Sequence, residues 1–315
     1  MTQVTDSPIF IVGAARSGTT LLQYMVRSHP RISLPTGESH FIVPMLQRAA
    51  EFGDLSREEN ITRVLEAIYA RHRYFLDDEL HGVKFAVPSM ASALVERGVT
   101  DMTSLIDGIF QVNAAGEGKS RWGDKTPYYA LHLERLLDAY PDAQVIHIVR
   151  DGRDCALSML ERKFDLRIFN IHEAAEIWMQ YVCAAREAGK KFGPERYFEF
   201  RYEDLTKDPE TTMRAICAFL NEEYSDETVN YRKAADSGDG PLKTPLLQQP
   251  VQSQNSEKWR SNMSSWDQRI FESVAGDVLI DSGYSLSKPD PEPLLFPVVS
   301  TAYKVHGRLM RLRAG

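Results

Sequence analysis

The chain is poor in cysteine and has no long apolar run. Its three cysteines, Cys155, Cys183 and Cys217, stand alone in helix-like apolar stretches, a pattern that favours reduced thiols over a disulfide framework or a CxxC metal site. No apolar segment approaches the ~20 residues needed to cross a bilayer, and no basic region followed by an apolar run opens the chain. We therefore expect a soluble, cytoplasmic protein without a transmembrane segment.

The chain also lacks an excess of positive charge. Its formal net charge is −7 over 315 residues, so the composition gives no global attraction to nucleic acid, and we expect no nucleic-acid partner. Any anion site must come from a local concentration of arginine and lysine. With 43% hydrophobic and 26% charged residues, the chain has the ordinary composition of a globular protein with a sizeable core.

The order of apolar segments predicts the fold class. Strand-like segments alternate with helix-like ones, which implies an α/β fold of three layers, with a central parallel sheet flanked by helices. We expect one domain over residues 1–285, with a mostly helical, cap-like region at about 40–118 whose clearest predicted helices are 41–50, 58–73 and 103–115. A further helix is predicted at 129–140, and the Gly, Pro, Gln and Ser content of 237–255 predicts an irregular segment. A Pro-rich segment and a basic tail follow over 286–315. The predicted strands are 7–13, 31–34, 121–124, 144–149 and 197–201.

The most informative stretch runs from Pro8 to Leu22, where an apolar strand leads into a turn and then a helix start. Gly13 and Gly18 have the spacing of a nucleotide-binding P-loop. Free N–H groups at the start of a helix, together with the helix dipole, suit a bound phosphate. Thr19 stands where an NTPase would have its lysine, and Arg16 places a cation inside the loop. The loop therefore predicts phosphate binding without ATP hydrolysis.

A second anion-binding element follows the predicted buried strand at 144–149. Arg150 stands at the end of this strand, and Ser158 lies about two turns into the next helix. Since ligands of open α/β sheets bind beyond the carboxyl ends of the strands, Arg150 and the Arg16 loop should open onto one crevice. Two phosphate sites on one ligand follow. The alternative is a surface turn in which Arg150 and Arg153 pair with the neighbouring aspartates.

Together with Tyr202-Glu-Asp-Leu-x-x-Asp-Pro209 and a late Lys-Trp pair, these motifs resemble the sulfotransferases that use 3′-phosphoadenosine 5′-phosphosulfate (PAPS). The resemblance covers roughly residues 8–270. It implies a P-loop NTPase-like sulfotransferase fold, PAPS as donor, 3′,5′-adenosine bisphosphate (PAP) as product, and no metal. It also implies that Arg150 and Ser158 hold the 3′-phosphate. The loop implied to hold the 5′-phosphosulfate consists of Ala15, Arg16, Ser17, Gly18, Thr19 and Thr20.

The resemblance leaves the adenine contacts less well defined. Leu21 follows the Gly-Thr-Thr of the loop, where many cytosolic relatives have a tryptophan that stacks on adenine. The resemblance therefore implies that Tyr202 or Trp259 holds the base. Lys258 and Arg260 resemble the late basic loop that closes over the nucleotide in this family.

Sulfuryl transfer, like phosphoryl transfer, requires in-line positioning and neutralisation of the charge that grows on the bridging oxygen. Arg16 and Lys125 are the candidate cations. The acceptor must also lose a proton, so a base is required. The histidine of cytosolic sulfotransferases is missing from the Asp124-Lys-Thr-Pro127 turn, whereas Glu38 and Lys125 match the base and its supporting lysine in the protein-tyrosine sulfotransferase-like branch. Glu38 is the predicted base, and His40 and His132 are alternatives.

Two other functions remain compatible with the loop, namely a P-loop kinase or NTPase and a nucleotide-binding relative without transfer activity. The acceptor is not specified by any motif; it is a hydroxyl or amine of a small molecule, saccharide, lipid or peptide. The basic tail could contact a membrane or a partner as an amphipathic helix. Its cations are Lys304, Arg308, Arg311 and Arg313.

Overall fold

The computed structural model describes residues 6–71, 83, 85–232, 247, 251, 255–287 and 296–314. Most of the segment 237–255, expected to be irregular, lies outside the described residues. The whole Pro-rich segment 288–293 and residues 72–73, the expected end of a helix, also lie outside them.

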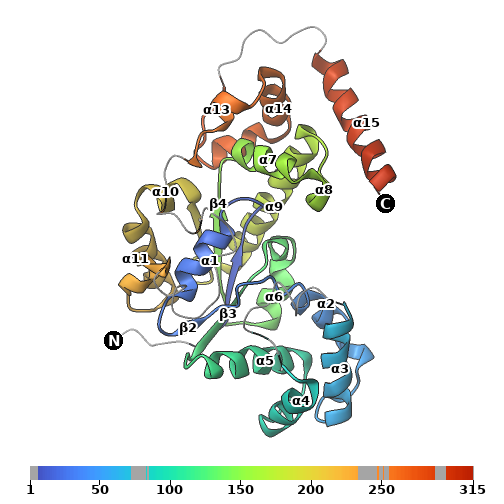
Figure 1. The fold of residues 1–315 in the computed structure, drawn as a ribbon, viewed down its shortest axis with the longest axis vertical. Coiled ribbons are helices and arrows are strands. Elements are labelled where there is room, and N and C mark those ends of the chain that lie inside the picture. The colour runs from blue at the N-terminus through green and yellow to red at the C-terminus, as the bar shows by residue number, and fades with distance from the viewer. Residues whose placement is uncertain are drawn as a thin grey trace.

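In the described part of the chain, five parallel strands form one sheet in the order β2-β3-β1-β4-β5 (Figure 1). Every residue of β1 and β4 is buried, as expected for parallel strands covered on both faces. All five predicted strands are present, which confirms the α/β class. Their bounds are β1 Ile9–Val12, β2 Ile32–Ser33, β3 Arg121–Lys125, β4 Gln144–Val149 and β5 Tyr197–Arg201.

Helices cover both faces of the sheet. The longer ones are α1 (Thr19–Arg27), α3 (Glu58–Arg71), α4 (Val87–Glu96), α5 (Met102–Gly116), α7 (Gly152–Glu161), α9 (Ile171–Phe192), α11 (Pro209–Leu220), α14 (Ser265–Asp281) and α15 (Phe296–Ala314). The shorter α-helices are α2 (Ile42–Gln47), α6 (Leu133–Ala139), α8 (Lys163–Leu166), α10 (Tyr202–Lys207) and α13 (Trp259–Asn262). Short 3-10 helices are η1 (Ala49–Glu51), η3 (Pro127–His132) and η4 (Asp226–Thr228). Among the helices described, none combines the length and apolar character that crossing a bilayer requires.

The side chains of β1 alternate between the two layers of helices. Ile9 and Ile11 pack in a cluster with apolar residues of α1 and α11. Phe10 and Val12 point to the other face, where they join a larger cluster contributed by α2 to α6 and α9. This alternation is what a central strand of a three-layer domain requires.

The region 40–118 is mostly helical, as predicted, and α2 to α5 gather beside the β3 end of the sheet (Figure 1). Two details differ from the expected elements. The helix expected at 41–50 is divided into α2 and η1, and α4 appears in a stretch for which no separate helix was expected. Similarly, the helix expected at 129–140 begins as η3 and becomes α-helical only at Leu133.

A buried arginine joins several elements at the amino ends of the strands. Arg121 is fully buried and donates hydrogen bonds to the carbonyls of Ser7 and Leu220, each at 2.7 Å, and to Gln144 Oε1 at 2.7 Å. It also pairs with Glu222, whose side chain is 1% exposed, at 3.2 Å. Burial lowers the pKa of Arg121, while Glu222 opposes this effect.

We expect Arg121→Met to destabilise the chain by about 3–5 kcal/mol, because it removes the donor of two carbonyls and of the buried Glu222 Oε1, and leaves Arg31, at 3.0 Å, to pair with that carboxylate. The free energy of unfolding in urea measures this loss. The matched control is Arg214→Met, which removes an exposed pair with Glu210 at 2.8 Å and should cost no more than about 1 kcal/mol. Equal losses in the two variants would contradict a structural role for the Arg121 network.

Candidate active site

The loop between β1 and α1 has two residues in the left-handed region, Arg16 at φ 68° and Gly18 at φ 97°. A Cβ on Gly18 would lie 2.4 Å from Cδ2 of Tyr202, so the tyrosine ring packs directly on the loop and only glycine fits. No side chain in the described part of the chain caps the start of α1. The first N–H groups of this helix are therefore without a side-chain acceptor, as in an anion-binding loop.

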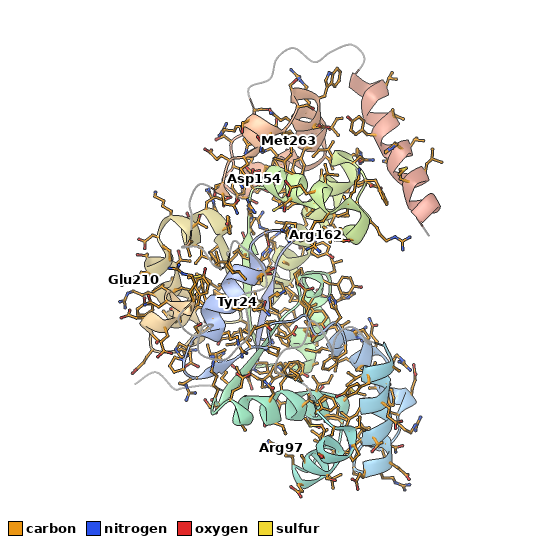
Figure 2. The ribbon with its side chains drawn as sticks, viewed as in Figure 1. Tyr24, Arg97, Asp154, Arg162, Glu210 and Met263 are labelled. Carbon is orange, nitrogen blue, oxygen red and sulfur yellow. The ribbon has the colours of Figure 1, made fainter. Side chains whose placement is uncertain are left out.

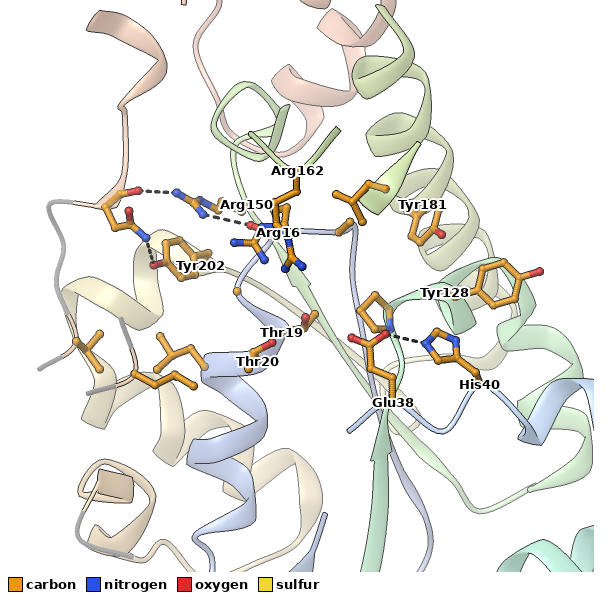
Figure 3. Close-up of a pocket in the computed structure, with 18 of the residues that line it drawn as sticks. Arg16, Thr19, Thr20, Glu38, His40, Tyr128, Arg150, Arg162, Tyr181 and Tyr202 are labelled. Carbon is orange, nitrogen blue, oxygen red and sulfur yellow. Dashed lines mark hydrogen bonds and ion pairs between the residues drawn. The ribbon is translucent and has the colours of Figure 1, made fainter. Parts of the chain in front are cut away.

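A cavity of about 410 Å³ lies beside this loop, beyond the carboxyl ends of the strands (Figure 3). Its two sides differ in chemistry. Residues of the loop and two arginines that flank helix α7, Arg150 before it and Arg162 after it, form one side, and residues that follow β2 and β3 form most of the other. The loop side includes Ala15, Arg16, Gly18, Thr19, Thr20, Leu21, Arg150 and Tyr202, and the opposite side includes Glu38, His40, Pro127, Tyr128 and Tyr181.

Three arginines meet on the loop side. The Nε of Arg16 donates to Ser158 Oγ at 2.9 Å, and Arg150 donates to the carbonyl of Arg16 at 3.2 Å. Burial, followed by the charges of Arg162 and Arg150, lowers the pKa of Arg16. Figure 3 shows Arg16 and Arg162 close together, with Arg150 beside them. Like charges at this spacing repel one another, so the cluster is suited to a bound polyanion.

Arg150 is held in place from several sides. Its Nη2 donates to the carbonyl of Asn255 at 2.6 Å, and its guanidinium lies 4.6 Å from the centre of the Tyr202 ring. Its Nε is buried and has no hydrogen-bond partner among the described residues. Arg150 Nη2 also lies 3.9 Å from Asp154 Oδ2, as the alternative expected, but Arg150 is 7% exposed and lines the cavity, so a surface turn is wrong for this residue.

Arg153 does pair with an aspartate, but inside the protein. It binds Asp151 at 2.8 Å and Glu272 at 2.7 Å and is 1% exposed. It therefore ties α7 to α14 and does not face the cavity.

Glu38, across the cavity, has a side-chain nitrogen at each carboxylate oxygen. Lys125 Nζ lies 2.7 Å from Oε1, and His40 Nε2 lies 3.0 Å from Oε2. Burial by itself would raise the pKa of Glu38, but the charge of Lys125 and the hydrogen bonds from His40 and Lys125 lower it to about 2. Glu38 is therefore ionised at neutral pH, and both of its oxygens are engaged.

The loop that carries Glu38 is fixed to the end of β3 through Ser39. The N–H of Ser39 donates to Thr126 Oγ1 at 2.9 Å and to Asp124 Oδ1 at 3.3 Å. Its hydroxyl lies 2.9 Å from the hydroxyl of Tyr129. Burial raises the pKa of Asp124 to about 6, despite the opposing hydrogen bonds. These contacts place Glu38 directly over Lys125, the last residue of β3.

Three of the residues assigned to the nucleotide lie elsewhere. Trp259, on α13, is 2% exposed. The guanidinium carbon of Arg153, on α7, lies 3.6 Å from the centre of its ring. Asp154 fixes it there by accepting the N–H of Trp259 at 2.9 Å, and Figure 2 shows Asp154 beneath α13. Lys258 and Arg260 are exposed. Among the described residues, none of the three lines the cavity or is hydrogen-bonded to a residue that lines it, whereas Lys125 and Ser158 are bonded to Glu38 and Arg16. The three are therefore not part of the proposed site.

The other predicted residues are distributed as follows. Lys125 is 3% exposed and lies beneath Glu38, and Ser17 is buried, with an Oγ that has no hydrogen-bond partner in the described part of the chain. His132 lines a different pocket, with Leu46 and Asp138. It is therefore separated from Glu38, whereas His40 is in contact with it.

Some cavity residues were missed by the sequence analysis. Arg162 follows Ser158 by four residues, a spacing that places both on one side of α7, and this signal was available. Tyr128 and Tyr181 lie opposite the loop, on η3 and α9, and Asn255 contacts Arg150 and Tyr202. No local pattern marks these three. In the described ranges, no group of three or more His, Cys, Asp and Glu side chains gathers in the manner of a metal site.

A profile of the sulfotransferase family matches residues 8–226. An uncharacterized protein of Aquifex aeolicus is 26% identical over 264 residues, which cover 80% of this chain and 30% of that protein. A protein-tyrosine sulfotransferase of Drosophila melanogaster is 23% identical over 260 residues, which cover 80% of this chain and 46% of that protein. The chain thus spans less than half the length of these two relatives.

The sulfotransferase domain of the Synechococcus PCC 7002 olefin synthase has a similar fold, with a TM-score of 0.60 at 22% identity over 90% of this chain and 99% of that one. This likeness confirms the predicted fold. The profile match confirms the family that the motifs predict and decides against the kinase or NTPase alternative. The Drosophila relative supports the predicted branch.

We expect Lys125→Met to raise the pKa of Glu38, because the lysine charge is the largest influence that lowers it. A pH titration followed by NMR of labelled glutamate carboxyls measures the shift, with Glu38→Gln to assign the signal. His40→Ala should give a smaller rise. A pKa lowered on folding stabilises the folded chain above the ordinary value of 4.5, and this stabilisation is lost as the pH falls towards 2. An unchanged titration in Lys125→Met would contradict the ion pair.

Proposed function

The chain belongs to the sulfotransferase family, and from this premise we propose that it moves a sulfuryl group from PAPS to an acceptor hydroxyl, with Glu38 as the base. The observation that carries the proposal is the pairing of an arginine cluster at Arg16 and Arg150 with a Glu38–Lys125 pair across one cavity. The first group suits a doubly phosphorylated nucleotide. The second suits proton removal from an acceptor next to the reacting sulfur.

The residues present fit the donor. The buried Ser17 Oγ and Arg150 Nε have no hydrogen-bond partners among the described residues, and a phosphate oxygen is a suitable acceptor for both kinds of donor. Residues 15–20 would hold the 5′-phosphosulfate. Arg150 and Ser158 would hold the 3′-phosphate, with Arg162 as an additional cation. Arg16, which already reaches Ser158, would link the two ends of the nucleotide.

The adenine would lie away from Trp259, in the part of the cavity next to Tyr202. One side of the Tyr202 ring is covered by Gly18, and the Arg150 guanidinium lies near the ring. The apolar side chains available to contact a base in that part of the cavity are Leu21, Tyr231, Leu247 and Val251.

Lys125 connects donor binding to the base. It occupies Oε1 of Glu38, so it has to leave before that oxygen accepts a proton. We propose that Lys125 turns to the bridging oxygen between phosphorus and sulfur, where negative charge grows during transfer. Its departure frees Oε1 and removes the main influence that lowers the pKa of Glu38. His40 stays on Oε2 and keeps the carboxylate oriented.

The proposed transfer is a single in-line displacement at sulfur. The acceptor oxygen forms a bond to sulfur while the bond from sulfur to the bridging oxygen breaks. The acceptor proton goes to Glu38 Oε1, and the bisphosphate product carries away the additional negative charge beside Lys125. PAPS supplies the activated sulfuryl group, and the protein supplies orientation, cations and the base.

The acceptor side of the cavity favours a hydroxyl on an aromatic or apolar group. Pro127, Tyr128, Tyr181 and Leu166 line this side around Glu38. Burial, together with Tyr128 and Glu38, raises the pKa of Tyr181 to about 12, so its ring is a neutral wall at physiological pH. The tyrosine named for the Drosophila relative is one acceptor of this chemistry. Aryl, lipid and tyrosyl-peptide hydroxyls are the acceptors to screen first.

Calorimetric titration should show that PAP binds without metal and that ATP with Mg²⁺ binds much more weakly. We expect Arg150→Ala to weaken PAP binding by about 1.5–3 kcal/mol, because it removes charged hydrogen bonds. The exposed Arg135, which lies at another pocket, gives a control: Arg135→Ala should bind like the unmodified chain. A preference for Mg-ATP, or unchanged PAP affinity in Arg150→Ala, would refute the donor site.

Glu38→Gln should nearly abolish transfer of labelled sulfate from PAPS to the acceptor while PAP affinity is retained, because the amide keeps the shape but does not take up the proton. His132→Ala should keep its activity, since His132 lies at a separate pocket. Substantial turnover by Glu38→Gln would exclude Glu38 as the base. PAP binding without transfer to any acceptor in the screen would identify a binding protein and refute the proposed reaction.

A further inference from the structure

The last helix, α15, contacts the rest of the protein along one face. Asn170 Nδ2 donates to the carbonyl of Tyr303 at 2.9 Å. Gly307 lies so close to the start of α9 that a Cβ there would be 2.4 Å from Glu173 Oε1. Tyr303 and Gly307 therefore mark the face of α15 that packs against α9, and Figure 1 shows the helix at the outer edge of the molecule.

A second, apolar face of α15 is exposed to solvent. Val298, Val305 and Leu309 are 66%, 49% and 54% exposed, and they are three of the few large apolar side chains that the described part of the chain exposes. Their spacing of seven and four residues puts them on one stripe, within about 40° of each other around the helix axis. Gly307 lies on the opposite side, so α9 does not cover this stripe.

The charge of α15 differs from that of the whole chain. The helix contains Lys304, Arg308, Arg311 and Arg313 and no acidic residue, in a chain with a net charge of −7. Lys304, which directly precedes Val305 in the sequence, is exposed. A helix with an exposed apolar stripe, a concentration of cations and no acidic residue has the composition of one that lies in the interface of an anionic bilayer.

We propose that α15 docks the protein on an anionic membrane surface, with Val298, Val305 and Leu309 entering the interface and the positive charge of the helix attracting the anionic lipid. The proposal does not depend on the sulfuryl-transfer activity. The charge of α15 favours an anionic membrane over a second copy of the chain, because pairing of two copies of α15 would bring four positive charges on each helix together. Anionic lipid is complementary to those charges, and the apolar stripe supplies the part of the binding that salt does not screen.

Co-sedimentation of the full chain with lipid vesicles tests this docking. We expect at least about tenfold more binding to phosphatidylcholine vesicles that contain phosphatidylglycerol than to phosphatidylcholine alone, and weaker binding as salt is added. The variant Val298→Ser/Val305→Ser/Leu309→Ser should lose most of the binding. The control is Ile280→Ser on α14, an equally exposed apolar residue outside α15, which should bind like the unmodified chain.

Circular dichroism and PAP binding show whether each variant is folded, so loss of vesicle binding in a folded variant is interpretable. Equal partition of the unmodified chain onto both vesicles, or full binding by the triple variant, would overturn the proposal. Light scattering tests whether a second copy of the chain covers the stripe instead. A dimer of the unmodified chain that becomes a monomer in the triple variant would show that a second copy covers the stripe, and would also overturn membrane docking.

Discussion

The parallel register of the central strands is the constraint on which the whole site depends. Ile11 of β1 lies beside Lys125 of β3, and Val12 lies beside His147 of β4. Because the strands are parallel, all three end at the same edge of the sheet. The β1 loop, Lys125 and Arg150 are therefore brought to one cavity, although 25 residues or more separate each from the next along the chain. A shift of one residue in any of these strands would turn its terminal side chain to the other face.

This edge gathers charge that the rest of the fold has to compensate. Three arginines converge on the loop side, and their repulsion is relieved only in part by Ser158, by the carbonyls of Arg16 and Asn255, and by Asp154 at 3.9 Å from Arg150. Such an arrangement is stable because apolar clusters on both faces of the sheet stabilise the fold that carries it. The fold thus tolerates a destabilising cluster of like charge at the position where an anion would relieve it.

The sequence was sufficient for what local pattern determines. Apolar runs located the strands, and the loop spacing and the strand-end arginine located the arginine-rich side of the cavity. The sequence was insufficient where the direction of a side chain depends on packing against residues that are distant along the chain. Trp259 looked like a base-stacking residue, but Asp154 accepts two backbone N–H groups near it and fastens α13 onto α7. Tyr181 reaches the cavity from the middle of α9, and nothing in its neighbouring residues distinguishes it from the helix's core positions.

The direction of the Arg16 side chain was likewise not predictable from the motif. It determines which cation contacts which part of the site. With φ 68° the loop turns this side chain toward Ser158 and the other arginines. That leaves Lys125 as the cation in contact with the proposed base, because the Ser39 contacts keep Glu38 over the end of β3. In the proposed reaction one lysine serves first Glu38 and then the leaving oxygen, so release of the base and stabilisation of the leaving group occur together. While it neutralises Glu38, the carboxylate is a weak base, so a hydroxyl that enters before the donor meets an inactive site. Donor first, acceptor second is the order that this electrostatic arrangement favours.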